Sequence, residues 1–255
     1  MTNLIKTKDE IQLLRKSGAI LSKTISKVIE NAKPGTTILE LDKIAHDYIL
    51  SNNCKPAFLG HHGFPNTICS AVNDQIVHGI PNDYVLKDGD IFTVDCGVIY
   101  KGYCSDSAVT ISVGEKNKEA DEFITNVQKT LYKAINFIKP GVKTGDLGAM
   151  IETDVKSYGY HVFKELIGHG IGQSLWEPPN VPNFGRIGKG TTLKEGMVIC
   201  VEPIVGKTTG IYIEEQDGWT LRTSDGNLAC QQEHMLLITK NGCEVLTQRY
   251  DEKIN

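Results

Sequence analysis

Four carboxylates in this sequence stand within or beside stretches of apolar residues. Asp95 interrupts "DIFTVDCGVIY", Asp106 interrupts "YCSDSAVTISV", Glu202 follows "MVICV", and Glu233 precedes "HMLLIT". A carboxylate buried among apolar side chains is destabilising by several kcal/mol unless a partner neutralises it or it takes up a proton. Any one of the four could be an edge-strand charge that faces solvent. The recurrence of the pattern favours a shared cation site.

The first two carboxylates flank a predicted hairpin turn at Lys101-Gly102. With a two-residue loop, Asp106 pairs with Gly97, and Asp95, two residues from Gly97, shares its face of the sheet. The two carboxylates are then diagonal neighbours, about 7–8 Å apart at the backbone and closer at their oxygens. A register shifted by one pair would make them directly opposite, so their proximity does not depend on this detail. Like charges placed together are unfavourable without a cation.

One histidine, His169, lies in the run "GHGIGQSLWEPP" (168–179), where glycines on both sides let another group approach the backbone. Taken alone, such a histidine is more often an ordinary hydrogen-bonded residue than a ligand. Together with four carboxylates it completes a donor set whose charge balances two divalent cations. This set suits Mn²⁺, Fe²⁺, Co²⁺ or Zn²⁺ and does not choose among them. HExxH, GxSxG and GxxxxGK[ST] motifs are absent, and "GHGIGQ" lacks the spacing of a dinucleotide site.

The composition is that of an ordinary globular chain of 255 residues, with 40% hydrophobic and 23% charged residues. A formal net charge of −4 gives no general attraction to nucleic acid or to an anionic membrane. The start, "MTNLIKTKDE", lacks the apolar core of a signal peptide, and no apolar run reaches membrane-spanning length. Seven cysteines, scattered and without a CxxC pair, indicate free thiols in a reducing cytosol.

The elements that must position these residues recur in two halves. Lys-Pro-Gly triplets end two amphipathic helical runs, at 33–35 and 139–141, and a second helical pattern follows each triplet. Thr37 and Glu40 fit a capping box at the start of the first of these. Strand-like segments come after each helix pair. The alternative is that these common helix-ending residues recur by chance. The pattern predicts an α+β fold in which helices pack on a mostly antiparallel sheet. It also predicts one domain over residues 1–255 with pseudo-twofold halves.

At these residues the chain resembles the methionine aminopeptidases of the short, bacterial type I form, which have the pita-bread fold. The resemblance runs from the helix near Lys8 to "NGCEVLT" (241–247). It is carried by "NDQIVHGIP" (73–81), "DGDIFTVDCGVIYKGYCSDSA" (88–108), "GHGIG" (168–172), "CVEPIV" (200–205), "DGWTLRT" (217–223) and "QQEHMLLIT" (231–239). The internal repeat is also what this fold implies.

The family pattern implies a role for each predicted ligand. Asp95 chelates one metal ion, Asp106 and Glu233 bridge both ions, and His169 and Glu202 complete the second site. Glu202 is also implied as the general base for the attacking water. The cofactors implied are two divalent ions, with cobalt, manganese, iron and zinc as the candidates.

The resemblance also implies a substrate site. His78, in "IVHGIP", matches a histidine that contacts the scissile peptide, and Phe64, Cys69 and Trp219 match positions lining the methionine pocket. For these three, ordinary core packing is a compatible interpretation, because such pockets are mostly apolar. The implied activity is removal of the initiator methionine from nascent proteins and peptides when the second residue is small. We therefore expect a cytoplasmic monomer that acts on methionyl chains at the ribosome, without membrane or specific nucleic-acid partners.

Two kinds of alternative remain. Proline-specific relatives with this fold carry a long extra N-terminal domain, and type II methionine enzymes carry a late helical insertion; neither is expected here. A catalytically weakened or non-catalytic binding protein is the other alternative, because Trp176 stands where the family typically has a histidine near the substrate's carbonyl. An indole offers one N–H donor, no acceptor, and no proton exchange near neutral pH.

Overall fold

The first helix pair of the computed structural model, which describes residues 4–115 and 117–254, comprises α1 (Lys8–Asn31) and α2 (Ile38–Ser51). The helix α1 begins near residue 8, as predicted. The capping box predicted for α2 is present, because the Glu40 amide donates to Thr37 Oγ1 at 3.2 Å and the Thr37 amide donates to Glu40 Oε2 at 2.8 Å. These bonds satisfy amides that a helix start otherwise leaves unpaired.

A second helix pair repeats the first. It consists of α3 (Lys118–Phe137) and α4 (Thr144–Ser157), and α4 has the same 14-residue length as α2. The residue before each of these shorter helices forms an isolated antiparallel bridge with a later segment, Thr37 with Val85 and Lys143 with Thr192. The predicted repeat is therefore a repeat of structure, with corresponding helix ends and anchors.

The strands form four sheets, and every pair of strands in the described part of the chain is antiparallel, as predicted. The first sheet joins β1, β2, β4 and β5, and the largest has the order β15-β14-β9-β7-β8. The bounds in chain order are β1 (Lys55–Pro56), β2 (Ile68–Val72), β3 (Gln75–Val77), β4 (Ile91–Tyr100), β5 (Tyr103–Ser112), β6 (His161–Val162), β7 (Gly168–Gly170), β8 (Glu177–Val181), β9 (Val198–Val201), β10 (Ile204–Gly206), β11 (Tyr212–Glu214), β12 (Leu221–Thr223), β13 (Ala229–Gln231), β14 (His234–Ile238) and β15 (Cys243–Val245).

The hairpin of β4 and β5 has the predicted register. Gly97 pairs with Asp106, and Asp95 pairs with Ala108, so the two aspartates are diagonal neighbours on one face. In the second half, the apolar run at 196–205 is less regular than its sequence suggests. It divides into β9 and β10 at Glu202-Pro203, because proline has no amide hydrogen for a strand ladder.

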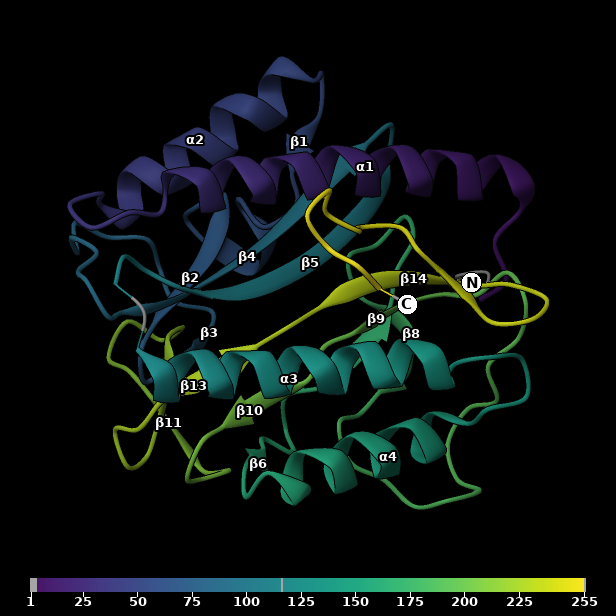
Figure 1. The fold of residues 1–255 in the computed structure, drawn as a ribbon. Helices are drawn as coiled ribbons and strands as arrows, with labels where there is room; N and C mark the ends of the chain where they lie inside the picture. The colour runs from purple at the N-terminus through teal and green to yellow at the C-terminus, as the bar shows by residue number, and fades with distance from the viewer. Residues whose placement is uncertain (1–3, 116, 255) are drawn as a thin grey trace.

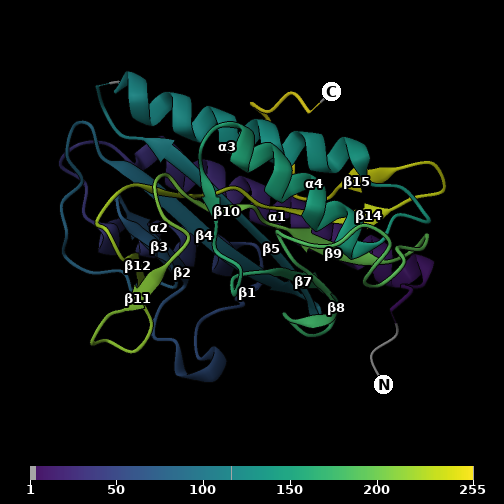
Figure 2. The ribbon, with the colours of Figure 1, turned by 90° about the horizontal axis from the view of Figure 1, so that it is seen from below.

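The helices cover the sheets from two places. Figure 1 shows α1 lying along β4 and β5, with α2 beside α1 and near β1, while α3 and α4 lie over the strands of the second half. Figure 2 shows the same α3 and α4 layer from below. Each helix pair buries its own apolar cluster, and a third cluster lies between the halves and includes Phe58, Phe64, Cys69, Cys200 and Met235. The third cluster is the one that adjoins the acidic residues described next.

Two further expectations concern membrane-spanning helices and the pairing of the cysteines. No helix in residues 4–115 and 117–254 has both the length and the apolar character needed to cross a membrane. All seven cysteines lie in the described part of the chain and are unpaired, as predicted from their number and spacing.

Candidate metal centre

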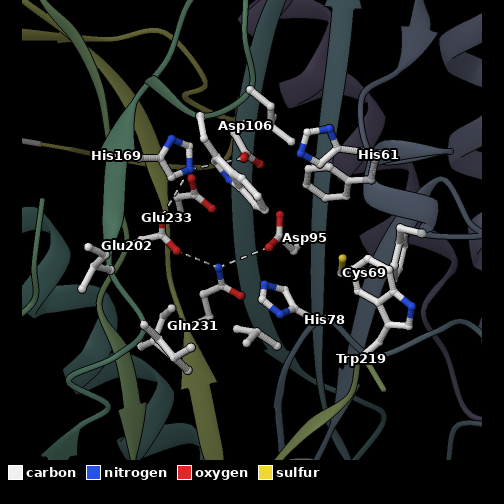
Figure 3. Close-up of a pocket in the computed structure, with 18 of the residues that line it drawn as sticks. His61, Cys69, His78, Asp95, Asp106, His169, Glu202, Trp219, Gln231 and Glu233 are labelled. Carbon is white, nitrogen blue, oxygen red and sulfur yellow. Dashed lines mark hydrogen bonds and ion pairs between the residues drawn. The ribbon is translucent and has the colours of Figure 1, made fainter. Parts of the chain in front are cut away.

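The five predicted metal ligands come together in one cavity at the junction of the two halves (Figure 3). Asp95 is on β4, Asp106 on β5 and His169 on β7, while Glu202 follows β9 and Glu233 precedes β14. Side chains from five separate segments therefore converge. The sequence positions of these residues span more than half of the chain, so only the tertiary fold brings them together.

His169 is oriented as a ligand with one free ring nitrogen. Its Nδ1 lies 2.9 Å from the Gly170 carbonyl oxygen, to which it can donate, and its Nε2 lies 3.8 Å from Asp106 Oδ2 and 3.7 Å from Glu202 Oε1. Burial lowers the pKa of His169 to about 4, so the ring is neutral at pH 7. A neutral imidazole with Nδ1 as the donor leaves the Nε2 lone pair for a metal ion.

The four carboxyl groups are buried, which disfavours their charged forms. Burial raises the pKa of Asp95 to about 7, and burial followed by charge repulsion raises the pKa values of Asp106, Glu202 and Glu233 well above the usual carboxyl range. Asp95 Oδ1, Asp106 Oδ1 and Glu233 Oε1 are buried without a hydrogen-bond partner. Unpaired buried oxygens aimed into one cavity are what a divalent cation satisfies, so the residues present fit a metal group.

The glycines on both sides of His169 allow neighbouring backbone segments to pack closely against β7. A Cβ at Gly168 would lie 2.4 Å from the Cys200 carbonyl oxygen, and one at Gly170 would lie 2.1 Å from that of Pro178. Any side chain at either position would push β7 away from β9 or β8. The ring of His169 would then move away from the carboxylates.

Glu233 is positioned by a direct link between the halves. Its amide donates to the Ala108 carbonyl at 2.9 Å, and its own carbonyl accepts from Ser107 Oγ at 2.7 Å. Both partners belong to β5, the strand that carries Asp106. These bonds therefore fix the spacing between Asp106 and Glu233, two of the predicted ligands.

Gln231 belongs to the site and was missed by the sequence reasoning. Its Nε2 is 3.3 Å from Asp95 Oδ2 and 3.5 Å from Glu202 Oε2, so one amide group bridges carboxylates of the two halves. The signal was present in "QQEHMLLIT", because residues two apart in an extended segment share a face. Gln231 stands two residues before Glu233.

Cys200 is a second residue that the sequence did not single out. Ligand atoms of Asp106, His169, Cys200 and Glu233 all lie within 4.8 Å of one another. Burial and the adjacent carboxylates, Glu233 first among them, raise the pKa of the Cys200 thiol well above its usual value. In the absence of a cation the protonated thiol is a donor toward the Glu233 carboxylate. Glu202, the fifth predicted ligand, lies outside this group of four, and its Oε1 is 3.7 Å from His169 Nε2.

The predicted substrate residues line the same cavity. Phe64 is buried, and its ring meets that of Trp219 edge to face at a centroid distance of 5.2 Å. Cys69 pairs with Asp95 across β2 and β4, which places its side chain on the face that carries the carboxylates. The cavity thus has an apolar wall next to its acidic floor (Figure 3). Its volume is about 220 Å³.

His78 enters the cavity from a strained backbone. Its φ is +60°, in the left-handed region that side chains other than glycine seldom adopt. The next residue, Gly79, accepts from the Ser70 amide at 2.9 Å, and a Cβ there would lie 1.9 Å from the Ser70 carbonyl oxygen. The close contact with β2 holds the loop, and the loop directs His78 into the cavity (Figure 3).

Trp176 stands at the rim of the cavity and remains 52% exposed. Its ring centroid lies 6.4 Å from that of His169 in a T-shaped arrangement. The indole is therefore near the place where the resemblance implies a histidine. It extends the apolar wall toward solvent.

Comparison with known proteins assigns this architecture to a class. The model of metallopeptidase family M24 matches residues 12–240, and the chain belongs to that family. Methionine aminopeptidase of Clostridium perfringens is 40% identical over 244 residues, which covers 96% of this chain and 98% of that protein. Methionine aminopeptidase 1 of Bacillus subtilis is 37% identical, covering 96% and 99%.

Solved structures give the same fold. Methionine aminopeptidase from Thermotoga maritima aligns with a TM-score of 0.95 and 37% identity, covering 98% of this chain and 100% of that one. Prolidase from Pyrococcus furiosus aligns with a TM-score of 0.79 and 29% identity, but this chain covers only 66% of it. The predicted pita-bread fold, with helices on antiparallel sheets, is confirmed by these matches.

Proposed function

We propose that this chain removes the N-terminal methionine from peptides and nascent proteins whose second residue is small. One observation carries the proposal: five ligand residues from both halves face a cavity whose adjoining wall is apolar. Relatives named methionine aminopeptidase match nearly the whole chain, which supports the same activity here.

The proposed cofactor is a pair of divalent cations held by Asp95, Asp106, His169, Glu202 and Glu233. In this assignment Asp95 would hold one ion, His169 and Glu202 would hold the other, and Asp106 and Glu233 would be shared between them. Its support is the grouping of Asp106, His169 and Glu233 within 4.8 Å and the contact of His169 with Glu202 at 3.7 Å. When bound, such a pair polarises the substrate carbonyl and lowers the pKa of a water molecule into the nucleophilic range.

Glu202 is the proposed general base. It lies directly after β9, its backbone carbonyl accepts from Asn183 Nδ2 at 2.8 Å, and its carboxylate faces the other ligands. Burial and repulsion by Asp106 raise the pKa of its carboxyl, which brings its proton affinity toward that of a base working at neutral pH. We propose that Glu202 accepts a proton from the attacking water and then returns it to the leaving amine.

His78 and the apolar wall are proposed to orient the substrate. Burial lowers the pKa of His78, so the ring is neutral and can donate one hydrogen bond to the peptide backbone. Phe64, Cys69 and Trp219 are proposed to surround the methionine side chain. A cavity of about 220 Å³ admits one such residue and leaves the second residue at the rim, where a large side chain would meet the surrounding wall.

We further propose that residues 1–255 act as one domain and as a monomer in the cytoplasm, with nascent chains at the ribosome as substrates. Unpaired cysteines are consistent with a reducing compartment. The third apolar cluster, which spans both halves, is consistent with their acting as one unit.

A single assay separates the candidate functions. Purified protein loaded with Mn²⁺ or Co²⁺ is incubated with Met-Ala-Ser and, in parallel, with Leu-Pro, and the released amino acid is quantified. Release of methionine alone supports the proposal, and faster hydrolysis of Leu-Pro indicates a proline-specific enzyme. An inactive protein that retains both metals indicates a binding protein, the alternative raised by Trp176.

A further inference from the structure

His61 has an unsatisfied polar atom inside the cavity. It begins the short 3-10 turn η1 (His61–Gly63), lines the cavity, and its Nε2 is buried without a hydrogen-bond partner. Figure 3 shows its ring pointing into the cavity from the side opposite His169. A buried imidazole nitrogen without a partner is costly to the empty protein, so it marks a place where a bound group can pair.

Backbone hydrogen bonds within the turn that carries His61 hold its conformation. The His61 amide donates to Phe58 O at 2.9 Å, the Phe64 amide donates to His61 O at 2.9 Å, and the Gly60 amide donates to Phe64 O at 2.8 Å. Gly60 and Gly63 have φ values of +82° and +92°, which glycine adopts without strain. The backbone of the turn is therefore fixed, and the ring is presented from a defined position.

The ring itself is held by Trp176. The two ring centroids lie 4.9 Å apart in a T-shaped arrangement, and Trp176 in turn lies beside His169. The indole thus stands between the ligand histidine and His61. This arrangement gives Trp176 a role as the flat support of a neighbouring imidazole, in addition to its apolar area.

The surroundings select which ring nitrogen of His61 carries the proton. Burial lowers its pKa, so the ring is neutral with one N–H. The four carboxylates of the cavity are acceptors, and Nε2 is the buried ring nitrogen, so this lining favours the tautomer with the hydrogen on Nε2. That tautomer presents a donor toward any group bound over the floor.

We propose, on the basis of the proposed function, that His61 Nε2 donates a hydrogen bond to the carbonyl oxygen of the scissile peptide bond. His61 then supplies from η1 the imidazole that Trp176 lacks, and the donor is aimed where negative charge develops during hydrolysis. No proton is transferred by His61 in this step. The inference assigns a substrate-contacting residue and accounts for both its unsatisfied nitrogen and its packing on an indole.

The test compares His61→Phe with His62→Phe in the metal-loaded enzyme on Met-Ala-Ser. His62 is the matched control: it belongs to the same turn and stacks on Trp176 at 5.8 Å, but it is exposed and does not line the cavity. Loss of a hydrogen bond to a charged transition state predicts a fall in kcat of about 10–100-fold for His61→Phe. KM, the affinity for Mn²⁺ measured by calorimetry, and the kcat of His62→Phe should each stay within about threefold.

Two more variants keep the inference testable if His61→Phe is poorly folded. His61→Gln retains a side-chain N–H donor and should keep more of kcat than His61→Phe. Adding Trp176→His to His61→Phe should restore at least part of the lost kcat by returning an imidazole to the rim. Three results would overturn the inference. One is a wild-type kcat in His61→Phe, and another is an equal loss of kcat in His61→Phe and His62→Phe. The third is that neither His61→Gln nor the added Trp176→His retains or restores kcat. Wild-type protein that holds metal but releases no methionine would overturn the proposed function instead.

Discussion

Replacing Asp106 with asparagine should stabilise the metal-free protein while abolishing its activity. The four carboxylates of the cavity are buried together, and burial raises the pKa of each, with repulsion between neighbouring carboxylates adding to the rise at Asp106, Glu202 and Glu233. Without a cation, Asp106 is therefore a source of repulsion. The isosteric amide removes one charge and leaves the packing of β5 intact.

The size of the gain follows from the spacing of the site. Ligand atoms of Asp106 and Glu233 lie within 4.8 Å of each other. Two unit charges at that distance repel by about 3.5 kcal/mol at an effective dielectric constant of 20. Proton uptake relieves part of this repulsion, so we expect a gain of about 1–3 kcal/mol in the free energy of unfolding at pH 8. For a chain of this size the gain corresponds to a rise in Tm of about 3–10 °C.

The pH dependence has a definite sign. A carboxyl whose pKa is raised by folding contributes stability below its unfolded pKa, and this contribution is lost as pH rises through the folded pKa. For Asp95 the folded pKa is about 7, so the loss extends to pH 8. Burial lowers the pKa of His169 from 6.5 to about 4, so this residue destabilises the folded state only below pH 6.5. Above pH 6.5 its contribution to stability does not change with pH. Between pH 6.5 and pH 8, metal-free wild type should therefore lose stability, and Asp106→Asn should lose less.

The assay is denaturation by heat and by urea in excess chelator at pH 6.5 and pH 8, with Asp83→Asn as the control. Asp83 is exposed and lies outside the cavity, so its replacement should leave Tm unchanged. Adding Mn²⁺ should raise the Tm of wild type and of the control, because a ligand that binds only the native state stabilises it, and should raise that of Asp106→Asn much less. A metal-free Asp106→Asn that is less stable than wild type, or equally dependent on pH, would refute this account of the site.

Three further predictions concern catalysis, selectivity and the fold. Glu202→Gln should lower kcat by at least about 100-fold while peptide binding changes little, because it removes the base; a loss confined to binding would mark a structural carboxylate. Peptides with N-terminal methionine followed by Gly, Ala or Ser should have the highest kcat/KM, and faster release of N-terminal proline or lysine from matched peptides would contradict the pocket assignment. Thr37→Ala should lower Tm by about 2–4 °C, since an N-cap is worth about 1 kcal/mol, with unchanged activity at 25 °C; an unaffected Tm would show that the capping box at α2 is not limiting.

Much of this architecture could be predicted because its signals are local. The register of β4 and β5 followed from a two-residue turn, which placed Asp106 opposite Gly97. The capping box at Thr37 followed from residue types three positions apart. The helix ends in the second half could be predicted from those in the first, because the Lys-Pro-Gly triplet recurs.

Other parts of the site depend on contacts that no local pattern encodes. Gln231 and Cys200 each stand two residues before a predicted ligand, so alternation could have suggested them, but their partners come from strands distant in the sequence. His61 carries no such signal. Its importance arises from a turn whose geometry depends on Gly60 and Gly63 and from an indole contributed by the other half of the chain.

The hydrogen bonds between β5 and the segment at 231–233 have a consequence for biosynthesis. The amides of Gln231 and Glu233 bond to Thr110 Oγ1 and to Ala108 O on β5. During translation, the hairpin of β4 and β5 and the helices that cover it emerge long before residues 231–233. Until then, that edge of β5 lacks these partners, and an open strand edge is a template for association with other chains. We expect chains truncated before β13 to aggregate or to require a chaperone, although they retain the first apolar cluster complete.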